Sequence, residues 1–234
     1  MVNPPSDPRG VVAAMDSGTG TDLLAPGVRL VLVRHGVTDY TVAGRLDGRG
    51  GADPPLNAHG LAQAQAVAAV VPALVGEGHE HVEVVTSSLQ RVRMTGAAIA
   101  QLLGRLATVD AGWDERSFGD WDGRTLAEIH AAAPEELARM RRDPGHPTPG
   151  GESRAEVAQR VLAAYRQVVT GPAARTVVVV TSRMPLLIVL GRVLAIGPER
   201  FWALGTAPAS VSVVDLWPDG NVSVPVVNRV DHLP

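Results

Sequence analysis

The chain has 234 residues and a formal net charge of −3, and its composition excludes several kinds of chemistry. Because it contains no cysteine, it has no disulfide framework, no thiolate zinc site and no cysteine nucleophile. All 21 cationic side chains are arginine, which removes lysine Schiff bases and the phosphate-binding loop that needs a Gly-Lys pair. The slight acidic excess argues against general nucleic-acid binding, so we expect no nucleic-acid partner.

The N-terminal part differs in composition from the rest of the chain. Residues 1–26 are rich in Pro, Gly, Ser, Thr and Asp and show no helical or strand period. This predicts a flexible tail, followed by a single domain over residues 27–234. The apolar stretch 11–15 is too short for a secretory core, and runs such as 66–71 fall far below the roughly 20 residues of a membrane span. We therefore expect a cytoplasmic protein with no membrane partner.

From residue 28 onward, short apolar strands alternate with helical patterns. Strands are predicted over residues 28–33, 82–85 and 176–180, and over a final pair, 210–216 and 222–227, joined by a turn. Helices are predicted after the N-cap Asn57, up to the stop at Gly104, over 125–141 with a break near Pro134, over 153–169 and over 185–195. Continuous apolar strands separated by helices indicate a mainly parallel sheet covered on both faces. The sequence therefore predicts an α/β fold, a three-layer α/β/α sandwich whose last strand pair adds an antiparallel edge.

Reactive side chains follow three of the predicted strands. Arg34 and His35 come directly after the first strand, Arg91 follows the second, and Ser182 and Arg183 follow the strand 176–180. In open α/β sheets the ligand binds outside the carboxyl ends of the strands. We therefore expect these side chains to share one site.

Several segments resemble the motifs of the histidine phosphatase superfamily, which includes cofactor-dependent phosphoglycerate mutases and many small phosphatases. They are 34–38 (RHGVT), 44–48 (GRLDG), 55–65 (PLNAHGLAQAQ), 87–95 (SSLQRVRMT), 115–123 (ERSFGDWDG) and 150–153 (GGES). The resemblance covers nearly all of the chain from residue 30 to about 233. It implies a phosphoglycerate mutase-like fold and phosphoryl transfer that needs no metal or other cofactor.

The residue types in these motifs suit phosphoryl transfer. His35 is the candidate nucleophile, because imidazole with a reference pKa of about 6.5 is largely neutral near pH 7. Arg34 and Arg91 supply planar, permanently charged groups that bind phosphate in bidentate fashion. Glu115 is the candidate proton donor for the leaving group. Further candidates for substrate binding are Thr38, Arg45, Ser182 and Arg183.

One segment departs from the family pattern. The family carries a second histidine after its third core strand, and Ser182 stands at that place in 177–185 (VVVVTSRMP). Loss of one well-aimed transition-state donor costs about 2.7–4 kcal/mol, or roughly 10²–10³ in rate. We therefore expect weakened hydrolysis, unless Arg183 or His146 fills the gap. Val37, Thr41 and Asp47 are further departures in the same predicted site.

Two functions remain open. In the first, the protein is a phosphoric monoester hydrolase that acts on a small phosphorylated metabolite through a phosphohistidine on His35. In the second, a repurposed non-hydrolytic enzyme or a pseudo-phosphatase uses the same arginines to bind a phosphorylated or carboxylated ligand. The intact nucleophile and arginines favour the first. The exposed edge of the final strand pair leaves room for a homodimer.

Overall fold

The structure is a computed structural model that describes residues 26–75, 81–172 and 174–234. Its centre is a six-stranded sheet in the order β3-β2-β4-β1-β5-β6. The first four strands in this order are parallel, whereas β5 and β6 run antiparallel to their neighbours. The predicted mainly parallel sheet with an antiparallel edge is confirmed. The predicted tail, residues 1–26, lies outside the described residues except for Pro26.

The elements have the following bounds. The strands are β1 (Val28–Arg34), β2 (His81–Thr86), β3 (Ala107–Val109), β4 (Arg175–Thr181), β5 (Val211–Leu216) and β6 (Val222–Arg229). The α-helices are α1 (Asp39–Val42), α2 (Ala58–Val70), α3 (Gln90–Leu103), α4 (Leu126–Ala132), α5 (Pro134–Arg142), α6 (Arg154–Val169) and α7 (Arg183–Val193). Short 3-10 helices are η1 (Val71–Leu74), η2 (Ala111–Trp113), η3 (Gly119–Trp121) and η4 (Pro198–Arg200).

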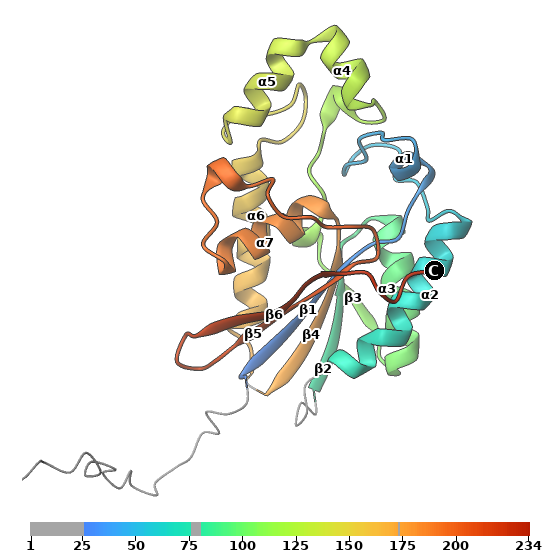
Figure 1. Cartoon of the computed structure of the whole chain (residues 1–234), viewed down its shortest axis with the longest axis vertical. Helices are drawn as coiled ribbons and strands as arrows, with labels where there is room; N and C mark the ends of the chain where they lie inside the picture. Colours follow the sequence, from blue (N-terminus) through green and yellow to red (C-terminus); the bar gives the residue numbers. More distant parts are fainter. Residues whose placement is uncertain (1–25, 76–80, 173) are drawn as a thin grey trace, which may run out of the picture.

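Helices cover both faces of the sheet, as Figure 1 shows, with α2 and α3 on one side and α6 and α7 on the other. Leu30 and Leu32 of β1 pack into the cluster that includes α6 and α7. Val31 and Val33, which point to the opposite face, pack into the cluster that includes α2 and α3. The apolar run of residues 30–33 is buried at every position, and such a run needs cover on both faces. Helices on both faces of the sheet therefore give a three-layer sandwich.

Local signals explain where most helices begin and end. Asn57 caps α2 by accepting a hydrogen bond from the backbone of Gly60, and Gly104 ends α3 in the left-handed region with φ of 62°. Pro134 is the first residue of α5, so the predicted break near this proline is confirmed. The predicted start of the last helix at residue 185 is wrong, because α7 begins at Arg183. Proline is tolerated in the first turn of a helix, where its missing N–H is not needed.

The helices α4 and α5 form a cap above the carboxyl ends of the strands (Figure 1). A small apolar cluster joins Ile129, Leu137 and Met140 of the cap to Trp121 of η3. The cap therefore lies beside the edge of the sheet at which the sequence predicts the active site. Within the described ranges, no helix has the length and apolar composition that a membrane span requires.

Candidate active site

The carboxyl ends of β1, β2 and β4 meet at one edge of the sheet. Arg34 at the end of β1 pairs in register with Thr181 at the end of β4, and Thr86 at the end of β2 pairs with Val180. The backbone N–H of His35 donates to the carbonyl of Thr181 over 3.0 Å. This register brings the segments that follow the three strands into one neighbourhood.

The loop after β1 is held against the start of α2 by close backbone contact. A Cβ atom added to Gly36 would lie 2.5 Å from the carbonyl oxygen of Gly60, and one added to Gly60 would lie 2.1 Å from that of Val37. The N–H of Val37 also donates to Oε1 of Gln63 over 3.0 Å. Only glycine fits at both contact positions, so the backbone that carries His35 is fixed by packing.

The ring of His35 is oriented and neutral. It is 4% exposed, and Nδ1 lies 2.6 Å from the carbonyl oxygen of Gly36. Because a carbonyl oxygen only accepts hydrogen bonds, Nδ1 carries the proton and Nε2 carries the lone pair. Nε2 accepts from Nε of Arg91 over 3.3 Å. Burial, together with the charges of Arg91 and Arg34, holds the pKa of His35 well below its ordinary value of 6.5.

The guanidinium of Arg91 is buried at 1% exposure and has partners on every side. Beyond its bond to His35, Nη2 donates to the backbone carbonyl of Asp47 over 2.8 Å. Nη1 forms ion pairs with Oδ1 of Asp47 at 2.9 Å and with Oδ1 of Asp53 at 3.5 Å. Burial raises the pKa of the Asp47 carboxyl to about 6, although Arg91 acts in the opposite direction.

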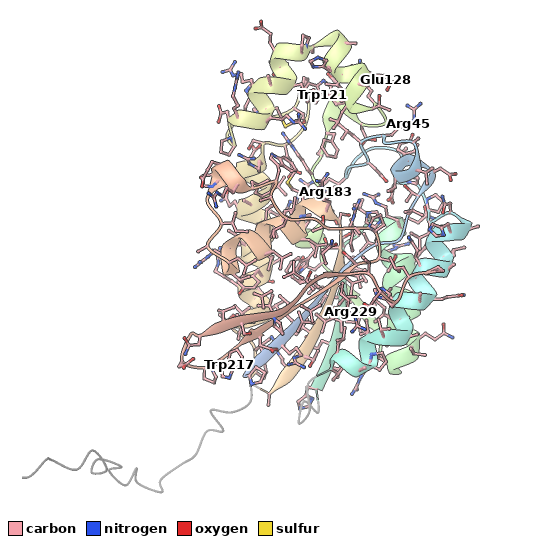
Figure 2. The ribbon with its side chains drawn as sticks, in the orientation of Figure 1. Arg45, Trp121, Glu128, Arg183, Trp217 and Arg229 are labelled. Atoms are coloured by element: carbon pink, nitrogen blue, oxygen red, sulfur yellow. The ribbon has the colours of Figure 1, made fainter. Side chains whose placement is uncertain are left out.

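Arg34 and Arg183 add positive charge to the same edge. Nη1 of Arg34 donates to the carbonyl of Thr206 over 2.5 Å, while its buried Nε has no hydrogen-bond acceptor in the described part of the chain. Burial lowers the pKa of Arg34 to about 10, and the charges of Arg183 and Arg91 act in the same direction. Arg183 is exposed at the start of α7, with its guanidinium carbon 5.6 Å from the ring centre of Trp202. Figure 2 shows Arg183 between the cap and the end of the sheet.

Glu115 and Ser182 lie at the N-terminus of α7. Oε2 of Glu115 accepts from the backbone N–H of Met184 over 3.1 Å, and Oε1 accepts from that of Arg116 over 2.7 Å. Ser182 is the N-cap residue but makes no capping bond through its side chain. Its hydroxyl is buried and has no hydrogen-bond partner among the residues described. The hydroxyl can therefore donate one hydrogen bond to a ligand that reaches it.

Comparison with known proteins identifies the family. Residues 30–229 match the family model described as the histidine phosphatase superfamily, branch 1. The chain belongs to this superfamily. The resemblance inferred from the short motifs is therefore confirmed.

Relatives of the chain include proteins that are named as phosphatases. The bifunctional protein Rv2228c of Mycobacterium tuberculosis is 33% identical over 231 residues, which cover 97% of this chain and 62% of the relative. Phosphoserine phosphatase 1 of Hydrogenobacter thermophilus is 31% identical over 198 residues, or 83% of this chain and 90% of that protein. The mycobacterial glucosyl-3-phosphoglycerate phosphatase Rv2419c in complex with VO3 superposes with a TM-score of 0.74 at 30% identity, covering 86% of this chain and 99% of that one. The family and these relatives support phosphatase chemistry.

In the described part of the chain, two of the predicted substrate-binding residues, Thr38 and Arg45, form no hydrogen bond or ion pair with His35 or Arg91. The hydroxyl of Thr38 accepts from the N–H of Thr41 over 3.0 Å and lies 3.5 Å from Oδ2 of Asp47. Arg45 is exposed and donates to the carbonyl of Gly123 over 2.5 Å. Figure 2 shows it beside the cap, near Glu128. The structure brings Arg34, His35 and Arg91 together. Arg45 instead contacts the backbone of Gly123.

Some features of the site carried no signal of their own in the sequence. From the sequence, Asp47 was only a departure from the family motif. The acceptor role of the Thr206 carbonyl could not be predicted, because every residue has a backbone carbonyl. His146, considered as a substitute histidine, pairs instead with Glu136 of α5. An open depression of about 600 Å³ lies beside Asp53, and its polar lining residues are Arg49, Asp53, Ser88, Asp114, Ser117 and Glu152. In the described ranges, no group of three or more His, Asp or Glu side chains could hold a metal ion.

Proposed function

We propose that this protein is a phosphoric monoester hydrolase that acts on a small phosphorylated metabolite through a phosphohistidine on His35. The observation that carries the proposal is the state of the His35 ring. Its proton is held on Nδ1 by Gly36, which leaves the lone pair of Nε2 beside Arg91. A neutral imidazole with this tautomer can attack phosphorus once a phosphoryl group replaces the hydrogen bond that Nε of Arg91 donates to Nε2.

The proposed reaction has two steps. Nε2 of His35 forms a bond to phosphorus while the bond from phosphorus to the leaving oxygen breaks, and that oxygen takes a proton from Glu115. Water then attacks phosphorus while the bond from phosphorus to Nε2 breaks. The water gives a proton back to Glu115, so inorganic phosphate leaves and both side chains return to their starting forms. Arg34 and Arg91 neutralise the charge on the phosphoryl oxygens. The buried Nε of Arg34, which lacks an acceptor among the described residues, is a donor available for one of them.

Ser182 sets the expected rate of this reaction. If serine replaces the second histidine of the family, the transition state loses a long, charged donor and keeps a short, neutral one. We therefore propose weakened hydrolysis. The same residue supports the second candidate, a phospholigand-binding protein or an enzyme of another reaction type, since an anion can still bind to the arginines when hydrolysis is lost.

The substrate is proposed as a small, polar phosphate ester. The polar lining of the depression beside Asp53 suits a hydroxylated or charged leaving group rather than an apolar one. Two relatives have names that refer to phosphatases of phosphoserine and of glucosyl-3-phosphoglycerate, both of which are polar metabolites. These names agree with the substrate class and do not select one member of it.

The test is hydrolysis of p-nitrophenyl phosphate together with trapping of the phosphoenzyme. The wild-type protein should hydrolyse the ester and incorporate labelled phosphate in an acid-labile, base-stable form, as a phosphohistidine requires. His35→Ala should abolish both signals. Arg93→Ala is the matched control, because Arg93 lies exposed on α3 two residues from Arg91, and it should retain both. Hydrolysis that survives in His35→Ala would contradict the proposal, and anion binding without hydrolysis or labelling would favour the second candidate.

A further inference from the structure

Asp47 contacts the two terminal nitrogens of the Arg91 guanidinium, to which an anionic ligand would bind. Its Oδ1 lies 2.9 Å from Nη1 of Arg91, and its backbone carbonyl accepts from Nη2 over 2.8 Å. The third nitrogen, Nε, is bound to His35. The ion pair is buried, with side-chain exposures of 1% for Arg91 and 11% for Asp47. In this structure each of the three guanidinium nitrogens therefore already has a partner in the protein, and the contact with Oδ1 of Asp47 is an ion pair.

The surroundings of Asp47 make its negative charge costly. Three further acidic groups face it from separate segments: Asp53 before α2, Asp122 after η3, and Glu115 before the cap. Arg91 on α3 is the cation that opposes them, and the hydroxyl of Thr38 is 3.5 Å from Oδ2. Burial and these acidic neighbours together outweigh the arginine, so the pKa of Asp47 rises to about 6. Asp47 can therefore gain or lose its proton near neutral pH.

A bound phosphoryl group and an ionised Asp47 would compete for the same cation. Two anions that share one guanidinium repel each other strongly in a buried site. When Asp47 takes up a proton, this repulsion disappears and the carboxyl gains an O–H that can donate to an anion oxygen. Neither consequence depends on which ester the anion belongs to.

We propose that Asp47 controls anion binding at Arg91: its ionised form occupies the guanidinium, and its protonated form releases it and donates a hydrogen bond to the bound anion. The inference rests on the proposed function for its ligand, the phosphoryl group. At a pH above the pKa of Asp47, binding of one anion takes up one proton from the solvent. Affinity is then constant below about pH 6 and falls about tenfold per pH unit above it.

Sulfate is the probe for this proposal, because it keeps one charge state across the range in which phosphate titrates. Binding is measured by calorimetry from about pH 5 to about pH 8 at constant ionic strength, in buffers of different ionisation enthalpy, so that proton uptake is counted. Wild-type protein should bind more weakly as pH rises and take up one proton at the alkaline end. Asp47→Asn, which resembles the protonated carboxyl, should bind with an affinity that does not change with pH and with no proton uptake.

Two further variants keep the test decisive. Asp53→Asn is the matched control, because it removes a carboxylate 3.5 Å from the same Nη1; it should retain proton uptake, with the midpoint moved to lower pH because Asp53 raises the pKa of Asp47. Asp47→Ser serves if Asp47→Asn does not fold, and folding is checked by thermal unfolding. Proton uptake that persists in Asp47→Asn would place the proton on His35 and overturn the inference. Sulfate binding by the wild-type protein that is independent of pH would also overturn it and leave the proposed function standing. Absence of binding in all variants at every pH, together with absence of hydrolysis, would overturn both.

Discussion

The two halves of the site are built from the same sheet edge but are completed to different degrees. In the half formed by β1 and α3, both ring nitrogens of His35 and all three nitrogens of Arg91 have partners, whereas the buried Nε of Arg34 has no acceptor among the described residues. In the half formed by β4 and α7, the hydroxyl of Ser182 has no partner within the described ranges, although it is just as deeply buried. His35 is therefore oriented for the role we propose for it, while Ser182 contributes one short, neutral donor to the other half.

This difference separates two requirements of catalysis. Attack by His35 needs orientation and neutrality, and the first half supplies both. Stabilisation of the transition state needs donors aimed at the phosphoryl oxygens, which is where the second half is poor. Substitutions in the first half should therefore remove activity, and substitutions in the second half can increase it.

The largest effect is expected for Arg91→Ala. This change removes the guanidinium from the imidazole and from the phosphoryl oxygens, and it leaves Asp47 buried without its cation. We expect kcat/KM for p-nitrophenyl phosphate to fall by about 10³ and vanadate to lose its stabilising effect on thermal unfolding. Arg93→Ala should behave like the wild-type protein in both measurements. A variant at Arg91 that still binds vanadate would show that the first half is not an anion site.

Ser182→His tests the second half directly and should act in the opposite direction. A histidine at the N-terminus of α7 would supply the missing donor, so we expect kcat to rise by about 10². Ser182→Ala is the control for the hydroxyl and should change kcat by less than about tenfold, because a single neutral hydrogen bond contributes about 1 kcal/mol. If Ser182→His gives no gain while Ser182→Ala is inactive, serine itself performs the role, and the two halves are equally complete.

The pH dependence of unfolding tests the charge state of Asp47 in the first half without any substrate. The raised pKa of Asp47 means that the folded state binds this proton more tightly than the unfolded chain, whose carboxyl titrates near 3.8. The folded state is thus favoured at low pH, and this advantage is lost as pH rises from about 4 to about 6. Relative to Asp47→Asn, the wild-type protein should lose about 2 kcal/mol of unfolding free energy over this range.

Urea unfolding of both proteins at about pH 4 and about pH 7.5 measures this difference. His35 is present in both, so the depressed pKa of its imidazole, which destabilises the fold as pH falls below 6.5, cancels in the comparison. A gap between the two proteins that stays constant with pH would show that Asp47 titrates normally, and the buried ion pair would then be no more than a structural link.

Much of the frame of this site could be read from the sequence, because it depends on local patterns. The uninterrupted valines of β4 predict a strand that is buried on both faces, and Asn57 and Gly104 mark helix ends by their own chemistry. In contrast, β3 has three exposed residues and α1 has four residues in all, and neither is long enough to show a period.

The contacts inside the site were harder to predict. Asp47 and Arg91 are 44 residues apart, and their pairing depends on how a loop returns to the sheet edge. Comparison with a motif can show that residue 47 is unusual, but it cannot show which cation forms an ion pair with the carboxylate of Asp47. The carbonyl of Thr206 illustrates the same limit, because a backbone acceptor leaves no trace in the residue type.

The smallest effect is expected for the two exposed arginines, Arg183 and Arg45, whose substitution tests how far the second half of the site extends. Arg183 follows Ser182 directly and acts on Arg34 through its charge, whereas Arg45 donates to Gly123 beside the cap. We expect Arg183→Ala to raise KM for a phosphate dianion about fivefold at low salt with kcat unchanged, because an exposed charge contributes about 0.2–1 kcal/mol. The increase should shrink as added salt screens the charge. Arg45→Ala should leave KM within about twofold at any salt concentration. Equal effects of the two substitutions would place Arg45 in the site and extend the second half to include the cap.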